Sequence, residues 1–228
     1  MTIEIGSNDA FDTRPKSPRF DRPILVLVEG RDDQSLLEAI VGALGLEQVI
    51  ETFEMRGKTD WVTKVQTIVT NTPLSSDIRA LGLVRDADQD AGASWQSCID
   101  ALAATGFPQP IEHAEAKFVE PLASAVLIIP DLKSSGAIEE LWLRAVEDSW
   151  IACIEQYFEC LGEKSPGPKT SKNRVRAFLA GARRAPPTLG VAYRMGAVNR
   201  DHETFDGIKN FLSSLAAAVR LDVPEGGL

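Results

Sequence analysis

The chain has 228 residues, of which 44% are hydrophobic and 25% charged, an ordinary composition for one globular domain or one domain with a small appendage. No apolar run approaches the ~20 residues that cross a bilayer, and the N-terminus lacks the basic and then apolar pattern of a signal peptide. Three cysteines without a Cys-x-x-Cys spacing argue against a disulfide framework. We therefore expect a cytoplasmic protein that makes no membrane contact.

Charge is unevenly distributed along the chain. The formal net charge is −9, yet nine of the 24 Lys and Arg lie within residues 164–200, which contain no Asp or Glu. Two interpretations stay open: a basic patch that binds nucleic-acid phosphates, or a solvated loop and helix whose charge aids solubility. On the first interpretation, the candidate nucleic-acid-binding residues are Lys172, Arg174, Arg176, Arg183 and Arg184.

The first elements in chain order predict a parallel α/β sheet. Residues 1–21 are polar and show no periodicity, so we assign them to a flexible tail. The apolar run Ile24–Val28 predicts a strand buried on both faces, as in parallel sheets covered by helices. The strand ends in Glu29 and Gly30, and Asp33 begins a helical pattern. A carboxylate at the tip of such a strand lies where open α/β sheets bind ligands.

A second strand within Gln48–Met55 and a helix over 59–71 are predicted next. The basic loop between them, residues 56–58, should lie at the same edge of the sheet as Glu29. This loop is a candidate for holding a phosphate group, and is otherwise an ordinary turn.

The next predicted strand, Arg79–Val84, runs into several acids. Asp86 and Asp88 lie two residues apart, so in an extended segment they point the same way. If this strand neighbours Ile24–Val28, their carboxylates meet Glu29 at one edge, and clustered carboxylates stay ionised only beside a cation. Oxygen ligands without nearby His or Cys favour Mg²⁺ or Mn²⁺. The alternative is an ordinary turn followed by a helix N-cap, which needs no metal.

A third buried strand, Ala125–Ile129, is followed by Asp131 and by a helix that carries Glu139 in its first turn. The helix dipole alone would stabilise a carboxylate at that position, which is the alternative to a metal ligand. The predicted organisation is a flexible tail over 1–21, an α/β core over 22–148, a C-terminal helical extension over 149–222 that includes the basic segment 164–200, and a tail over 223–228.

The extension is predicted to contain three helices. The first, Trp150–Leu161, is amphipathic, and we expect Cys153 and Cys160 to be small core residues on one of its faces. A short basic helix over Lys172–Arg184 follows, and a last helix over His202–Val219 packs on the sheet.

These motifs resemble the TOPRIM domain of topoisomerases, primases and OLD-type nucleases, and more fully a small bacterial TOPRIM-like family related to the OLD nucleases. The resemblance covers roughly Pro23 to Leu143. It rests on the strand followed by Glu-Gly, the strand followed by Asp-x-Asp, and the segments Leu83–Asp88, Ala125–Asp131 and Gly136–Glu139. It implies a mostly parallel TOPRIM or Rossmann-like sheet flanked by helices.

Five acids match the family residue by residue. Glu29 matches the TOPRIM glutamate, and Asp86 and Asp88 match the Asp-x-Asp pair. Asp33 matches the acid of the OLD-type Glu-x-x-x-Asp variant, and Glu139 matches a later acid of a second metal site. The resemblance implies that Glu29, Asp86 and Asp88 are catalytic, and that all five acids bind Mg²⁺ or Mn²⁺.

Two departures accompany this match. Many relatives carry Asn where this chain has Leu132, and no lysine matches the basic catalytic residue of the OLD nucleases, although Lys133 is nearby. Asp90 and Asp131 are reserve carboxylates for a site with two ions.

We therefore expect a divalent-metal-dependent nuclease that acts on phosphodiester bonds, since metal held by carboxylates neutralises phosphate charge. The alternative is a non-catalytic module that binds metal or nucleotide and works with a separately encoded ATPase, because the chain has no G-x-x-x-x-G-K-[ST] motif. A small-molecule phosphatase ranks third, because it would use a nucleophilic Asp where this chain has Glu29. The candidate partners are nucleic acid, such an ATPase and further copies of the chain.

Overall fold

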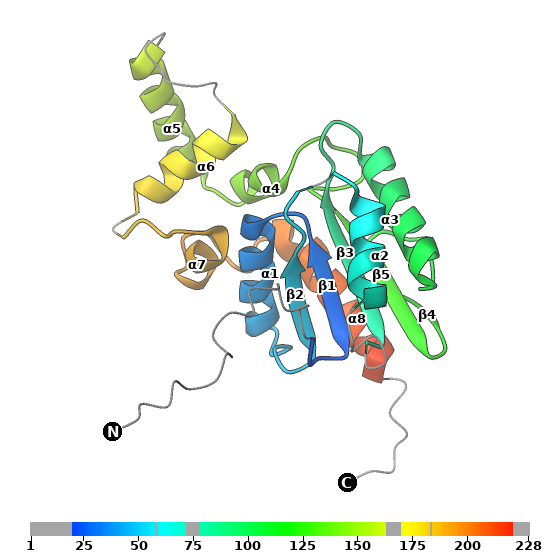
Figure 1. The fold of residues 1–228 in the computed structure, drawn as a ribbon. Helices are drawn as coiled ribbons and strands as arrows, with labels where there is room; N and C mark the ends of the chain where they lie inside the picture. Colours follow the sequence, from blue (N-terminus) through cyan, green and yellow to red (C-terminus); the bar gives the residue numbers. More distant parts are fainter. Residues whose placement is uncertain (1–19, 58, 72–77, 163–169, 183, 221–228) are drawn as a thin grey trace, which may run out of the picture.

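The computed structural model describes residues 20–57, 59–71, 78–162, 170–182 and 184–220. One sheet has the strand order β2–β1–β3–β5–β4, with helices on both faces (Figure 1). The strands are β1 (Ile24–Val28), β2 (Ile50–Glu54), β3 (Ala80–Asp86), β4 (Lys117–Val119) and β5 (Leu122–Ile129). The helices are α1 (Arg31–Ala43), α2 (Trp61–Asn71), α3 (Ala91–Thr105), α4 (Ile138–Arg144), α5 (Asp148–Leu161), α6 (Ser171–Ala180), α7 (Leu189–Arg194) and α8 (Asp206–Arg220), with a 3₁₀ turn at Glu203–Phe205. The predicted α/β fold is confirmed.

The sheet is parallel except at one edge. β1 pairs in parallel with β2 and β3, and β3 pairs in parallel with β5. Val28 lies opposite Val84, so the two acid-tipped strands are neighbours in register, as predicted. β3 continues two residues beyond the predicted end, which places Asp86 inside the strand. The antiparallel β4, which the sequence analysis misses, is a short exposed strand that blunts this edge against further pairing.

Two hydrophobic clusters hold the layers together. On one face, α2 and α3 cover side chains such as Leu27 and Leu83. On the other face, α1, α4, α7 and α8 join one cluster with Val26 and Val28. Gly82 in β3 permits the close approach of α8, because a Cβ atom there would lie 2.8 Å from the side chains of both Phe211 and Leu215.

Residues on both sides of the predicted core segment pack against it. Residues 1–19 and 221–228 lie outside the described residues, but Phe20, which the prediction assigns to the tail, is buried and packs edge-on against Phe53 at 5.4 Å. The last helix of the predicted extension packs on the sheet, as predicted, and side chains of α5, α6, α7 and α8 all contribute to the same hydrophobic cluster as the sheet. Hydrophobic surface on these late helices therefore completes the core on this face of the sheet.

Only α5 and α6 project away from the sheet (Figure 1). α6 is four residues shorter than predicted at its C-terminal end, and α7, which lies just beyond it, was not predicted. Cys153 and Cys160 are exposed, so the prediction that they are core residues is wrong. Within the part of the chain that the structure describes, no helix is long and apolar enough to span a bilayer.

Candidate functional site

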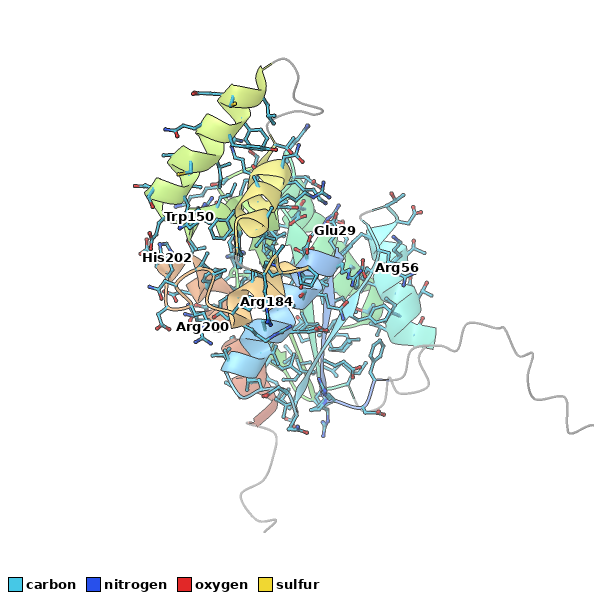
Figure 2. All side chains as sticks on the ribbon, turned by 90° about the vertical axis from the view of Figure 1, so that its left-hand side faces the viewer. Glu29, Arg56, Trp150, Arg184, Arg200 and His202 are labelled. Carbon is cyan, nitrogen blue, oxygen red and sulfur yellow. The ribbon has the colours of Figure 1, made fainter. Side chains whose placement is uncertain are left out.

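A pocket of about 590 Å³ opens at the carboxyl ends of β1 and β3. Elements far apart in sequence line it, including the β1–α1 turn, the β2–α2 loop, the start of α4 and the start of α6. Figure 2 shows Glu29 at this end of the sheet with Arg56 to one side. Four of the five predicted metal-binding acids line the pocket: Glu29, Asp33, Asp86 and Glu139.

The turn from β1 into α1 positions Asp33. Its carboxylate accepts a hydrogen bond of 3.0 Å from the backbone N–H of Gly30 and so caps the first turn of α1. A Cβ atom at Gly30 would lie 2.9 Å from that same carboxylate oxygen, so the Glu-Gly pair leaves room for Asp33 to fold back. Only 5% of Asp33 is exposed. Asp33 therefore has a structural role as well as a place in the pocket.

Asp86 is the most perturbed acid of the pocket. Its Oδ1 atom is buried and has no hydrogen-bond partner among the residues that the structure describes. Burial, and after it four neighbouring acids, raise the pKa of Asp86 to about 9. Those acids are, in order of decreasing effect, Asp33, Glu29, Glu139 and Asp88. The Asp86 carboxyl is therefore more stable when it is protonated or bound to a cation than as an isolated carboxylate.

Asp33 shows the same behaviour to a lesser extent. Burial is again the main cause that raises its pKa, here to about 7, and the negative charges of Glu139 and Glu29 add to it. The hydrogen bond from Gly30 acts in the opposite direction. The negative charges of Glu29 and Glu139 thus act on both Asp33 and Asp86, in keeping with the place of all four acids in one pocket.

Two cations approach the acids from opposite sides. Arg85 follows Val84 in β3 and its Nε lies 3.8 Å from Glu29 Oε2, with both side chains largely buried. Its guanidinium lies 5.4 Å from the centre of the Trp61 ring, which holds it under the pocket. Lys172 reaches in from α6, and its Nζ lies 3.8 Å from Glu139 Oε1. These two ion pairs compensate part of the negative charge.

Asp88 does not line the pocket, unlike the other four predicted metal-binding acids. Its φ of 51° is left-handed, so the premise of an extended Asp-x-Asp segment whose side chains point the same way is wrong. The backbone N–H of Asp88 donates to the Gly136 carbonyl at 2.9 Å, and the Gly136 N–H donates to the Asp88 carbonyl at 2.7 Å. The chain turns after Asp86 because this bridge to the start of α4 redirects it.

The reserve acids have structural partners of their own. Asp90 caps α3, since its side chain accepts from the Ala93 N–H at 2.9 Å. Asp131 pairs with Arg144 at 2.9 Å. Burial would raise the pKa of Asp131, but the hydrogen bonds from Arg144 and from the following loop outweigh it and lower the pKa to about 2. Neither acid lines the pocket.

The five predicted nucleic-acid-binding residues separate in space. Lys172 lines the acidic pocket. Arg174 pairs with Glu155 of α5 at 2.6 Å, which commits it to holding α5 and α6 together. Arg176 faces a groove between α5 and α6. Arg183 lies outside the described residues, and the exposed Arg184 lies lower in Figure 2, at the level of α7. The basic segment is therefore not one continuous patch.

Sequence reasoning missed two contributions to the pocket. It gave Arg85 no role, although a charged residue in the middle of Val-Arg-Asp at the end of a buried strand signals a paired side chain. It also predicted nucleic-acid contacts for Lys172 without bringing it to the acids. The position of α6 over the pocket depends on tertiary packing, which has no local signal in the sequence.

The donor set suits a hard divalent cation. It consists of carboxylate oxygens, and the unpartnered Oδ1 of Asp86 needs a cation or a proton. Within the described residues, however, no three acidic, histidine or cysteine side chains converge closely enough in this conformation to hold an ion. The residues fit a metal by chemistry and by location, and their side chains would have to rotate inward to enclose it.

Comparison with known proteins places the chain in a family. Residues 23–217 match the family described as "Protein of unknown function (DUF3226)". No curated protein matches the sequence. Among solved structures, the C-terminal region of the OLD protein of Xanthomonas campestris pv. campestris aligns with 89% of this chain and 98% of its own length, at 15% identity and a TM-score of 0.44. The C-terminal region of the Burkholderia pseudomallei OLD protein aligns with 87% of this chain and 88% of its own, at 14% identity and a TM-score of 0.38.

Proposed function

We propose that this chain, which belongs to DUF3226, a family of proteins of unknown function, is a divalent-metal-dependent nuclease that acts on the phosphodiester bonds of nucleic acid. The observation that carries the proposal is the buried, unpartnered Oδ1 of Asp86 in a pocket lined by six further acids, among them the predicted metal ligands Glu29, Asp33 and Glu139. A buried polar atom without a partner costs free energy, and so does repulsion among carboxylates. A divalent cation removes both costs at once.

Glu29, Asp33, Asp86 and Glu139 would hold Mg²⁺ or Mn²⁺ in this pocket. Bound there, the metal would neutralise charge on a phosphate and stabilise the leaving oxygen. Arg85 orients Glu29 through their ion pair and limits the repulsion that this acid meets from its neighbours. Glu29 is also the acid that we assign to proton transfer, since it lies at the tip of β1 and lines the pocket.

Phosphate binding is assigned to the cations on the rim. Arg56 and Lys172 line the same pocket as the acids, one from the β2–α2 loop and one from α6. A phosphodiester that enters between them would meet positive charge on two sides and the acidic floor beneath. Lys172 would then exchange Glu139 for a phosphate oxygen, which leaves Glu139 available to the metal.

One observation favours the alternative function, a non-catalytic module that binds metal or nucleotide beside a separate ATPase. No three metal-binding side chains converge within the described residues, as expected if this chain needs a partner to assemble its site. The two functions differ in what the isolated protein does with metal and with nucleic acid.

The deciding experiment is a calorimetric titration with Mn²⁺ and with Mg²⁺, paired with plasmid nicking on the same samples. Wild type is compared with Asp86→Asn and with Asp90→Asn. Asp90 is the matched control, because it is an acid of the same loop that caps α3, and Asn is an equally good cap. We expect Asp86→Asn to lose metal binding and to lower nicking about 100-fold or more, with Asp90→Asn like wild type.

Metal binding without nicking, abolished by Asp86→Asn, would reject the nuclease and support the partner-dependent module. Absence of metal binding by wild type would reject the nuclease and would leave the alternative only as a module that binds nucleotide. Equal losses in Asp86→Asn and Asp90→Asn would mean that the loop as a whole was disturbed, and would contradict the role given to Asp86.

A further inference from the structure

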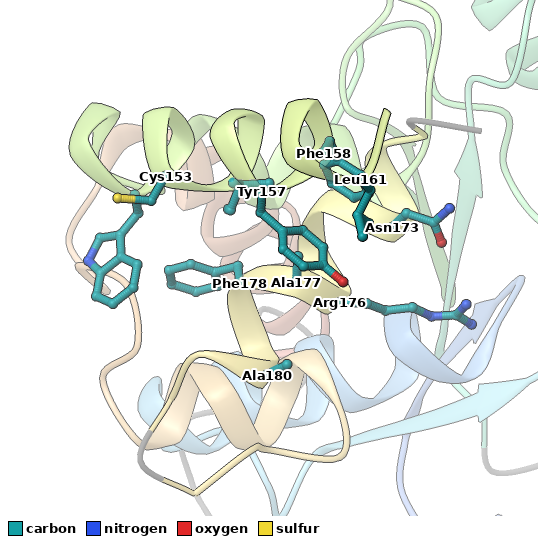
Figure 3. A pocket seen from close by; sticks show the side chains of 11 residues that line it. Cys153, Tyr157, Phe158, Leu161, Asn173, Arg176, Ala177, Phe178 and Ala180 are labelled. Carbon is teal, nitrogen blue, oxygen red and sulfur yellow. The ribbon is translucent and has the colours of Figure 1, made fainter. Parts of the chain in front are cut away.

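A second hollow lies between the two helices that project from the sheet. It has a volume of about 620 Å³ and is lined by the facing sides of α5 and α6. Figure 3 shows the rings of Tyr157 and Phe178 in the space between the helices, with Asn173 and Arg176 at one end. None of the described residues that line this groove is acidic. The groove is therefore aromatic along its length and carries a cation.

Two large aromatic side chains of the groove remain exposed. Trp150 is 47% exposed and Tyr157 is 54% exposed, although both lie on the side of α5 that faces α6. They are seven residues apart, which places them on one face of the helix about 10 Å from each other. Trp150 is held edge-on against the buried Phe178 at 5.9 Å, so its position is fixed. Ordered aromatic faces open to solvent are unusual unless they contact a ligand.

Helix α6 contributes residues to both the groove and the acidic pocket. Lys172, in the first turn of α6, lines the acidic pocket, and Asn173 and Arg176 line the groove. Arg176 lies one helical turn beyond Lys172, about 6 Å along the axis. α6 therefore presents one cation to the pocket and another to the groove, a single helical turn apart.

Charge favours a polyanion in this path. Among the described residues that line the groove there is one cation, Arg176, and no acid. On α5, Glu155 is neutralised by Arg174 rather than directed into the groove. The cations that stay directed at the path, Lys172 and Arg176, are spaced along it.

We propose that the groove between α5 and α6 binds single-stranded nucleic acid and leads it into the acidic pocket. Unpaired bases would stack on Tyr157 and Trp150, while Arg176 and Lys172 contact the phosphates. Paired bases are stacked inside a duplex and offer no free face to a side chain, so aromatic rings select the single strand. The inference rests on the proposed nuclease and specifies its substrate class.

The test is fluorescence anisotropy with a fluorescein-labelled oligothymidine and with a labelled duplex of equal length, both in EDTA so that cleavage plays no part. We expect wild type to bind the single strand more tightly. Tyr157→Ala should weaken that binding roughly 5- to 100-fold, and Tyr157→Phe, which keeps the ring, should restore it. Arg176→Gln should lower the dependence of log affinity on log salt by about 0.7, as expected for one lost phosphate contact to a single strand.

Phe118→Ala is the matched control, because Phe118 is also an exposed aromatic residue but lies on the edge strand β4. Binding that prefers the duplex, or that falls equally in Phe118→Ala and Tyr157→Ala, would overturn the inference. A wild-type dimer that light scattering shows to become monomeric in Tyr157→Ala would also overturn it, since the groove would then be a subunit interface.

Failure of this inference and failure of the proposed function are distinguishable. Plasmid nicking that survives Tyr157→Ala and Arg176→Gln, without single-strand binding, would leave the nuclease intact and reject the groove. Single-strand binding lost in Tyr157→Ala, from a protein that neither binds metal nor cleaves, would support the groove and reject the nuclease.

Discussion

The two hollows at either side of α6 differ in how the chain builds them. The acidic pocket forms where parallel strands end, and its acids are partly buried, coupled to one another and close to two cations. The groove forms where two amphipathic helices meet away from the sheet, and its side chains are mostly uncharged. Sheet topology fixes the first hollow, whereas helix packing alone fixes the second. Changes in the acidic pocket should therefore alter how the stability of the protein depends on pH and metal, whereas changes in the groove should not.

The largest expected difference is in pH dependence. The pKa values of Asp33 and Asp86 are about 7 and about 9 in the folded protein, both above the ordinary value near 4. The folded state therefore holds more protons than the unfolded state from about pH 4 upward, and stability falls as pH rises, until pH 7 for Asp33 and pH 9 for Asp86. The slope approaches 1.4 kcal/mol per pH unit for each carboxyl, by order of magnitude.

Urea unfolding of the metal-free protein between pH 5 and 9 measures this slope. Asp86→Asn should flatten it, and Mg²⁺ should restore stability at the alkaline end. Tyr157→Ala should shift the whole curve without changing its slope, because the groove contributes no strongly perturbed acid. A wild-type protein whose stability does not fall over this range would show that the pKa values of Asp33 and Asp86 are not raised in the folded state.

The next largest effect is expected from Arg85→Met, which keeps packing against Trp61 but removes the charge beside Glu29. Breaking a largely buried pair leaves the acid without this cation, so we expect a loss of about 3 kcal/mol at pH 8 without metal. Mg²⁺ should recover part of the loss, and Arg85→Lys should lose less. If urea unfolding gives the same loss with and without Mg²⁺, Arg85 acts through its contact with Trp61 and not through its charge.

A smaller effect is expected at Gly30. Gly30→Ala would place a methyl group 2.9 Å from the Asp33 carboxylate, displace it from its cap and cost about 1 kcal/mol or somewhat more. Gly42→Ala is the control in the same helix, since nothing lies within 4 Å of a Cβ atom there. That change should stabilise the protein by about 0.5–1 kcal/mol. Thermal unfolding of both variants tests this. A Gly30→Ala variant as stable as wild type would show that the turn accommodates a methyl group beside Asp33.

The smallest effect is expected from Arg174→Gln. The ion pair of Arg174 with Glu155 joins α5 to α6, but both side chains are about one-third exposed. Water screens such pairs, so the loss should stay below about 1 kcal/mol, well under that of Arg85→Met. A larger loss in thermal unfolding would mean that this single pair holds the two helices in place.

The part of the structure governed by the sheet could be predicted from sequence. A five-residue apolar strand with an acid at its tip, repeated once, was enough to predict neighbouring parallel strands and to bring Glu29, Asp33 and Asp86 to one pocket. Glu139 was assigned to the same site only by the family resemblance. In each case the signal is local, because the period of a buried strand and the acid at its end are adjacent in sequence.

The remaining features depend on contacts between distant segments. Asp88 was misplaced because a bridge to Gly136, nearly fifty residues later, turns the chain after Asp86. The position of Lys172 over the acids depends on how α6 packs on α4, and the pairing of Arg174 with Glu155 depends on how it packs on α5. Charge counts along the chain predicted one basic patch, whereas the fold distributes those cations over separate surfaces.

Gly82 has a consequence for biosynthesis. The missing side chain in β3 lets Phe211 and Leu215 of α8 lie directly on the sheet, so this face of the core is completed by residues near the end of the sequence. While the chain is being translated, β1, β3 and β5 emerge long before the helix that covers them. That apolar face must therefore stay exposed to solvent or to a chaperone until residues 206–220 leave the ribosome, and a chain that stops before α8 should aggregate.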